Sequence, residues 1–161
     1  MHGILLIDKP KGLTSYDVVR QVKRIFSTRK VGHAGTLDPL ATGVLIVAVG
    51  DATKILQFLL VDDKGYRATL KLGETTDTFD ALGQVQIKKP VPPLDIDSID
   101  RFCSAFRGPI EQQPPMYSAL KRDGVPLYKL ARQGLEVERD RRSITIERLS
   151  VVAVDSPFVT I

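Results

Sequence analysis

The sequence predicts an α+β fold, because strand-like and helix-like patterns follow one another along a chain of single-domain length. Ile4–Ile7 and Val44–Val49 are short, continuous apolar runs, which are typical of buried strands. Tyr66–Leu72 alternates apolar with polar side chains and therefore predicts a half-buried strand. A chain of 161 residues corresponds to one domain, and at that length it can bury a core.

Between the first two runs, the sequence predicts a helix and then a loop. Thr14 and Asp17 have the spacing of a capping box, which opens a helix. No period holds over Ser27–Gly43, which predicts a long irregular loop. After the second run, Asp51 is expected to cap a helix that continues to about Leu60. The apolar face of the first helix is expected to consist of Val18, Val22, Ile25 and Phe26.

The second half of the chain predicts shorter elements joined by loops. Gly73–Gly83 is polar and Pro114–Gly124 has no period, so both are expected to be irregular. Lys88–Pro93 is rich in proline, which predicts a stiff connector. Asp97 with Asp100 should open a helix that turns Ile99, Phe102, Cys103 and Phe106 inward. The remaining elements are a strand at Val85–Ile87, a helix at Leu127–Gln133, a long strand at Ser143–Val154 and the start of another at Phe158–Ile161.

Composition predicts a soluble intracellular protein. Hydrophobic residues make up 43% of the chain and charged residues 26%, which are ordinary values for a globular domain. The longest uncharged apolar stretch, Leu40–Gly50, is about half of the roughly 20 residues that a membrane span needs. The N-terminus shows no secretory signal, and a single cysteine, Cys103, excludes an internal disulfide. We therefore expect a cytoplasmic protein that does not enter a membrane.

The charge distribution favours a polyanionic partner. The formal net charge is +4, and two basic segments, residues 16–33 and 121–142, flank an acidic middle at residues 60–100. On charge alone, the alternative is that these segments are ordinary solvated helix faces.

One loop carries the residues best suited to chemistry. Gly32–Gly43 places glycines, His33 and Asp38 between a basic helix and a buried strand, and reactive groups are often held on loops between rigid elements. Pro39 disfavours the helical conformation at Asp38, so the carboxylate would be presented from extended backbone. The alternative is that Asp38 only starts an Asp-Pro turn.

Other chemistries fit this loop less well. It lacks the Gly-Lys-Ser/Thr of a P-loop, and the chain has too few histidines and cysteines for a zinc site. The sequence also lacks the Gly-x-Ser-x-Gly elbow that is typical of serine hydrolases. A lone carboxylate beside a basic surface suits nucleophilic or acid–base work on an anionic polymer.

The loop is also the strongest of several long motifs that match a known family in the same order along the chain. The others are Leu6–Gly12, Gly50–Lys54, Lys64–Ala68, Leu72–Thr78, Pro114–Lys121 and Leu127–Gly134. Together they closely resemble the bacterial tRNA pseudouridine synthases of the TruB type, in which Gly32–Gly43 corresponds to the catalytic motif. The archaeal and eukaryotic box H/ACA enzymes share some of these motifs.

The resemblance implies a pseudouridine-synthase fold, with a mixed, mostly antiparallel central sheet and helices packed on it. It implies one catalytic domain over residues 1–161 with an inserted thumb loop at about residues 112–138. The implied reaction isomerises a uridine in the T-loop of tRNA to pseudouridine by cleaving and re-forming the glycosidic bond, without a cofactor or a metal. The expected partner is the T-arm stem-loop of tRNA, and the expected state is a monomer.

The resemblance also assigns roles to single residues. Asp38 matches the essential aspartate of the family. Its chemical role stays open between three routes: attack at the sugar C1′, attack at the base C6, and elimination. Tyr66 matches a tyrosine that stacks on the target base, although the strand pattern alone would allow an ordinary inward tyrosine. His33 matches a histidine that helps accommodate the RNA as the target nucleotide leaves the stack.

The other matched residues are structural or belong to the thumb. Lys9 and Pro10 match a motif that packs beneath the catalytic loop. Tyr117 and Tyr128 are either core or contact residues. Four basic side chains of the thumb are expected to contact phosphates: Lys121, Arg122, Lys129 and Arg132.

The chain is expected to be a fragment of a longer protein. After the turn at Asp155–Pro157, Phe158–Ile161 would end as an unpaired apolar half-strand with an exposed edge. The resemblance places the family's active-site arginine, which pairs with the catalytic aspartate, beyond Ile161, together with a C-terminal RNA-binding region. The activity of this chain by itself stays open, and the alternative function is a non-catalytic RNA-binding or tRNA-folding module.

Overall fold

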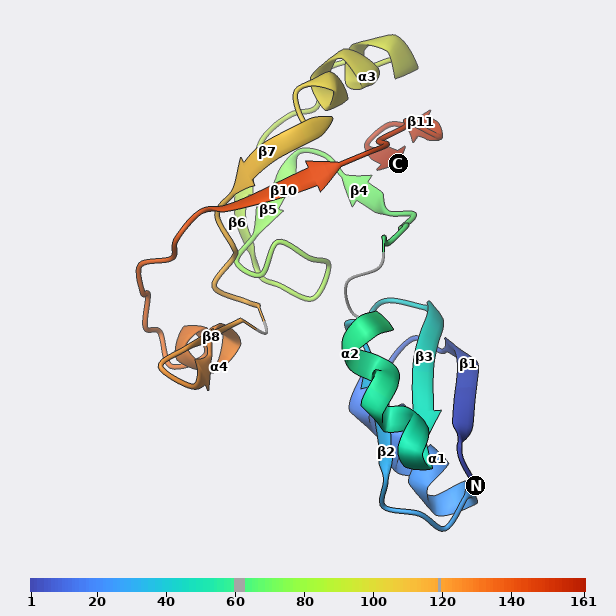
Figure 1. Ribbon diagram of the computed structural model, residues 1–161. Helices are drawn as coiled ribbons and strands as arrows, with labels where there is room; N and C mark the ends of the chain where they lie inside the picture. Colours follow the sequence, from blue (N-terminus) through green and yellow to red (C-terminus); the bar gives the residue numbers. More distant parts are fainter. Residues whose placement is uncertain (60–62, 119) are drawn as a thin grey trace. The chain divides into compact units, whose positions relative to one another are not determined.

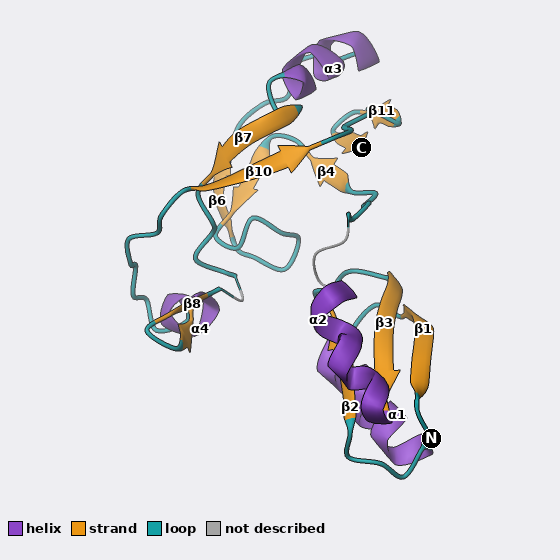
Figure 2. Cartoon of the chain, viewed as in Figure 1, coloured by secondary structure: helices purple, strands orange, loops and turns teal. Residues whose placement is uncertain are grey.

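The computed structural model confirms the α+β class (Figure 1, Figure 2). It describes residues 1–59, 63–118 and 120–161. Among these residues the strands form five small sheets, and the strand pairs are antiparallel. The chain divides into two compact units, residues 1–65 and 66–161, and each is described by itself. The single catalytic domain with a thumb at about residues 112–138 stays a prediction.

The first unit is a three-stranded sheet with helices packed on it (Figure 2). β1 (Gly3–Lys9) and β2 (Val31–Ala34) pair with opposite edges of β3 (Gly43–Val49). α1 (Ser15–Ile25) lies against one face, while the 3-10 helix η1 (Gly50–Ile55) and α2 (Leu56–Leu59) follow β3. Alternate residues of β3 point to one face of the sheet, where they meet α1. The resulting core consists of Val18, Val22, Leu45, Val47 and Val49.

The predicted start of α1 is confirmed in detail. The Thr14 hydroxyl accepts a hydrogen bond from the Asp17 backbone N–H at 3.1 Å, and the Asp17 carboxylate accepts one from the Thr14 N–H at 2.9 Å. This reciprocal capping box satisfies donors that a helix start otherwise leaves unpaired. Val18 and Val22 are buried as predicted, but Ile25 is exposed and Val19 is buried instead.

Three other expectations for the first unit are wrong. Ile4–Ile7 forms a strand, but it is an edge strand with one open face, and Leu6 is 73% exposed. The predicted loop at Ser27–Gly43 contains β2, whose four residues pair with β3. Asp51 does not cap a helix: Val49 occupies that position without a side-chain bond, and Asp51 pairs with other residues. The predicted helix end at Leu60 lies outside the described residues.

The described residues of the second unit, 66–118 and 120–161, form short paired strands and two short helices. β11 (Ala153–Asp155) and β4 (Thr69–Lys71) flank β12 (Phe158–Thr160) on its two sides. The other pairs are β5 (Glu74–Thr76) with β6 (Val85–Lys88), β7 (Gly108–Gln112) with β10 (Arg142–Ile146), and β8 (Lys121–Arg122) with β9 (Val125–Pro126). The helices are α3 (Ile96–Ser104) and α4 (Leu127–Ala131).

Several strand predictions for this unit need correction. Tyr66–Leu72 shortens to β4 and is largely exposed rather than half-buried. The expected loop at Gly73–Gly83 contains β5, and the expected long strand at Ser143–Val154 breaks into β10 and β11, which belong to different sheets. Pro114–Gly124 contains β8, and its residue 119 lies outside the described residues. β12 is paired on both sides, so the expected unpaired half-strand is wrong.

The predicted helices of this unit exist with different details. α3 begins after Asp95, which forms a capping box with Ser98, two residues before the predicted pair. Phe102 and Phe106 are exposed rather than inward. α4 is confirmed, although it ends at Ala131. Across the described ranges, no helix has both the length and the apolar character needed to cross a membrane.

Candidate active site

Asp38 lies on the loop that joins two neighbouring strands of the first unit. The loop leaves β2 after Ala34 and enters β3 at Gly43. The Asp38 carbonyl accepts the Ala41 N–H at 3.0 Å, so Asp38 does start a turn, with Pro39 at the position that proline favours. The Asp38 side chain is exposed. The loop therefore presents a carboxylate to solvent from a turn, which makes it available to a substrate.

Both neighbours of Asp38 in the chain are hydrogen-bonded to residues that follow β1: Leu37 to the first residue of α1, and Pro39 to the connection before it. The Ser15 hydroxyl accepts the Leu37 N–H at 2.9 Å and lies 3.2 Å from the Leu37 carbonyl, to which it donates. The Gly12 N–H donates to the Pro39 carbonyl at 2.7 Å. The Leu37 side chain also packs against the core. The backbone of the loop is thus fixed on either side of the carboxylate.

Lys9 organises the segment that provides these contacts. Its side chain is 0% exposed, and its ammonium donates to the Pro10 carbonyl at 3.0 Å and to the Leu13 carbonyl at 2.8 Å. A buried amine needs such acceptors, since burying a charge without partners is costly. Lys9 also stands opposite Gly43 in the strand register, directly where the Asp38 loop ends. Lys9 and Pro10 therefore lie beside this loop.

His33 belongs to β2 and is half-buried. Its Nδ1 lies 2.7 Å from the Gly35 carbonyl. Because a carbonyl oxygen can only accept, this contact places a proton on Nδ1. The histidine is therefore tied to the first residue of the Asp38 loop.

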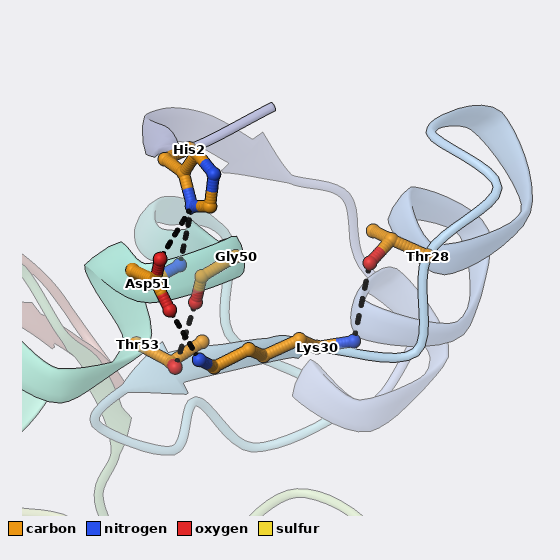
Figure 3. A network of polar contacts seen from close by, with 6 residues as sticks. All are labelled: His2, Thr28, Lys30, Gly50, Asp51 and Thr53. Atoms are coloured by element: carbon orange, nitrogen blue, oxygen red, sulfur yellow. Dashed lines mark hydrogen bonds and ion pairs between the residues drawn. The ribbon is translucent and has the colours of Figure 1, made fainter.

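A polar network occupies the other end of the same sheet (Figure 3). The Asp51 carboxylate contacts Lys30 and lies 3.2 Å from His2 Nδ1, which also accepts the Asp51 N–H at 2.8 Å. The bond from the Lys30 ammonium lowers the pKa of Asp51. Val49 pairs with Gly3 and Val31 at this end, whereas Gly43 pairs with Lys9 at the end nearest Asp38. The network thus joins the strand ends away from the candidate site.

Tyr66 and the four basic candidates belong to the second unit. Tyr66 is 68% exposed, so the alternative of an inward strand tyrosine is wrong. The next residue but one, Ala68, exchanges backbone hydrogen bonds of 2.9 and 3.0 Å with Ile161. The sheet of β4 and β12 therefore fixes the backbone just beyond an exposed aromatic ring.

The basic candidates lie together on a hairpin and the helix that follows it. Lys121 and Arg122 form β8, Lys129 lies in α4, and Arg132 comes directly after α4. All four are exposed. The Arg132 guanidinium lies 5.4 Å from the ring centroid of Tyr128, and Arg122 donates to the Glu138 carbonyl. Tyr117 and Tyr128 are both half-buried.

A shallow basic hollow of about 380 Å³ adjoins this hairpin. Among its lining side chains, Glu138 and Asp140 are acidic and five are basic. The excess of cations suits an anionic ligand. The basic side chains are Lys121, Arg122, Arg139, Arg141 and Arg142.

Sequence reasoning missed Ser15 and Gly12 as residues that hold the Asp38 loop. Ser15 directly follows a helix cap, where serine is common for local reasons, so its bond to a residue 22 positions away leaves no pattern in the sequence. Gly12 offered a clearer signal in the sequence, because it ends the turn-like stretch Lys-Pro-Lys-Gly. In the structure its φ is 92°, a conformation that favours glycine.

The model of the TruB family pseudouridylate synthases (N terminal domain) matches residues 23–161. A tRNA pseudouridine synthase B from Syntrophotalea carbinolica is 58% identical over 160 residues, which cover 99% of this chain and 52% of that protein. One from Geobacter sulfurreducens is 54% identical over 160 residues, 99% of this chain and 53% of that protein. The chain spans about half the length of the curated relatives it matches.

A solved structure agrees with these sequence relatives. A chain in a crystal structure of a Cbf5-Nop10-Gar1 complex superposes with a TM-score of 0.68 at 31% identity, covering 98% of this chain and 37% of that one. The family model matches residues 23–161, and both relatives match 99% of the chain. The chain belongs to the TruB family of pseudouridylate synthases.

Proposed function

We propose that the protein isomerises a uridine in the T-loop of tRNA to pseudouridine, with Asp38 as its catalytic residue. The observation that carries this proposal is the exposed Asp38 carboxylate on a loop whose backbone is bonded on both sides, in a member of the TruB family. A fixed, solvent-accessible carboxylate is suited to attack on a nucleoside or to acid–base work.

The reaction requires no change in atoms overall. The bond between the sugar C1′ and the base N1 breaks, the uracil rotates, and C1′ forms a bond to C5. The hydrogen on C5 is lost to solvent and N1 gains one. Asp38 would act at C1′, at C6, or as the base of an elimination, and each route needs its carboxylate within reach of the flipped nucleotide.

The proposal assigns supporting roles to residues of both units. Tyr66 would stack on the flipped base, consistent with its exposed ring. His33 would help accommodate the RNA, and Lys9 with Pro10 would support the loop from beneath. Lys121, Arg122, Lys129 and Arg132 would bind phosphates of the T-arm, consistent with their exposure on one hairpin and helix.

The finer predictions of the fold belong to the same proposal. They are a pseudouridine-synthase fold with one mixed, mostly antiparallel central sheet, a thumb at about residues 112–138, and a cytoplasmic monomer that uses neither metal nor cofactor. The superposition with a TM-score of 0.68 supports the fold.

Tritium release from a T-arm hairpin labelled at uridine C5, with the protein in excess, tests the function. Isomerisation must release this hydrogen, because C5 becomes the glycosidic carbon. We expect release from the unchanged chain and none from Asp38→Ala, with hairpin affinity retained. Asp51→Ala is the matched control, because it removes an exposed carboxylate at the opposite end of the same sheet. Equal release by Asp38→Ala would contradict the proposal.

A second candidate function is RNA binding without chemistry. The basic hollow beside β8 favours it, because that surface needs no catalytic residue to bind a phosphate backbone. This alternative predicts salt-dependent binding of the hairpin with no tritium release at any protein concentration.

A further inference from the structure

The Ser15 hydroxyl makes an unusual pair of contacts. It accepts the Leu37 N–H at 2.9 Å and donates to the Leu37 carbonyl across 3.2 Å, so one side chain satisfies both backbone groups of a single residue. A hydroxyl can do this because it carries one donor and two acceptor positions. Ser15 is only 2% exposed, which shields these bonds from competing water.

The helix does not need this hydroxyl for its own start. Thr14 and Asp17 already form the complete capping box of α1. Ser15 is the next residue, and its side chain points instead to a loop 22 positions along the chain. Burying the Ser15 hydroxyl without partners would cost free energy, and the two bonds to Leu37 remove that cost.

The position of Leu37 gives these bonds a consequence for Asp38. Leu37 directly precedes Asp38, and its carbonyl belongs to the peptide group that carries the Asp38 nitrogen. The Asp38 side chain is exposed, so packing does not orient it. Its direction depends on the backbone, which Ser15 holds on the N-terminal side and Gly12 holds on the other.

We propose that Ser15 is a positioning residue that sets the orientation of the Asp38 carboxylate by fixing both backbone groups of Leu37. This inference rests on the proposed function of Asp38 as the catalytic residue. It assigns a role in the reaction to a side chain that does not touch the RNA. A misplacement of about 1 Å at a reacting group lowers the rate up to about 100-fold, so loss of this contact should act on turnover.

The test compares Ser15→Ala with Thr53→Val in the full chain. Thr53→Val is the matched control, because it also removes a partly buried side-chain hydroxyl from the first unit. That hydroxyl donates a hydrogen bond to the Gly50 carbonyl at 2.9 Å, away from the Asp38 loop. Ser15→Thr retains the hydroxyl and serves as the conservative variant. Three quantities are measured: kcat and KM for the T-arm hairpin, and the exchange rate of the Leu37 amide hydrogen.

We expect Ser15→Ala to lower kcat by about 10- to 100-fold while KM stays within about twofold. The Leu37 amide should exchange at least about tenfold faster, because its acceptor is gone. Thr53→Val should change neither kcat nor the exchange rate of the Leu37 amide, and Ser15→Thr should retain most of the kcat of the unchanged chain. A purely structural role would lower the amount of folded protein and leave the kcat of the folded fraction unchanged.

The possible outcomes separate this inference from the proposed function. An unchanged chain that never turns over overturns both. An active chain in which Ser15→Ala has normal kcat overturns the role of Ser15 alone, as does an equal loss of kcat in Thr53→Val. If Ser15→Ala does not fold, Ser15→Cys fills the same space with a weaker hydrogen-bonding group, and an unaltered kcat with faster Leu37 exchange would then overturn the role of Ser15.

Discussion

Gly12 donates its backbone N–H to the carbonyl of Pro39 across 2.7 Å, and this bond joins the segment after β1 to the loop that carries Asp38. Gly12 reaches this position with a φ of 92°, in a region that side-chain-bearing residues rarely adopt. A Cβ added at Gly12 would meet nothing within 4 Å. Backbone conformation, and not space, therefore restricts the residue at this position.

Gly12→Ala should consequently lower the free energy of unfolding by about 1–2 kcal/mol, because the strain of the left-handed region falls on alanine. Gly3→Ala is the matched control: its added Cβ also has open space, and its φ is not positive. Urea denaturation of both variants measures the difference. Equal stability of the two variants would show that the backbone at Gly12 relaxes without cost.

Lys9→Met should destabilise the first unit by about 1–3 kcal/mol, since methionine fills a similar volume but leaves the Pro10 and Leu13 carbonyls without their donor. Lys11→Met is the control, because Lys11 is an exposed lysine two residues away. Thermal or urea unfolding measures both. A loss of equal size in Lys11→Met would mean that the buried amine contributes nothing specific.

The capping box should make the stability of the chain depend on pH at the acidic end. The Thr14 hydroxyl, followed by the Thr14 backbone and Arg20, lowers the pKa of Asp17 from its ordinary value of 3.8 to about 2. A carboxylate with a lowered pKa stabilises the folded state above its unfolded pKa, and this contribution is lost as the pH falls through the folded value.

The free energy of unfolding of the unchanged chain should therefore exceed that of Asp17→Asn most clearly above about pH 4, and the difference should shrink towards about pH 2. Denaturant titrations at several pH values measure it. Because hydrogen bonds from Thr14 cause most of the shift, much of the difference should persist in high salt. A difference that stays constant from pH 5 to about pH 2 would contradict the assignment.

Phosphate binding by the hairpin should appear in the salt dependence of RNA affinity. Replacing Lys121 and Arg122 with glutamine should reduce the slope of log affinity against log salt by about 1.5, close to the value for two lost phosphate contacts. The control replaces Lys71 and Lys88 with glutamine. It removes the same number of positive charges, but both of these lysines pair with Glu74. An equal reduction in both double variants would mean that only net charge matters.

The parts of the fold that could be predicted are those that depend on near neighbours. The capping box needs only Thr14 and Asp17, and β3 follows from one continuous apolar run. β2 was missed because Val31–Ala34 becomes a strand only through its pairing with β3. The break between β10 and β11 was missed for the same reason, since their partners lie in different sheets.

The candidate site divides in the same way. Asp38 stood out from its loop, and the resemblance to a family supplied roles for Tyr66, His33 and Lys9. No local pattern pointed to Ser15, because its two bonds reach a residue 22 positions away. The exposure of Leu6 could not be predicted either, because an apolar run does not reveal whether a strand lies at an edge.

The place of β12 between β11 and β4 has a consequence for the order in which the chain can fold during synthesis. β4 is made early, at Thr69–Lys71, but its partner is complete only at Thr160. The sheet of the first unit is complete once Val49 has left the ribosome. That unit can close on itself while the rest is still being translated, whereas β4 must wait, unpaired, until Thr160 has been made.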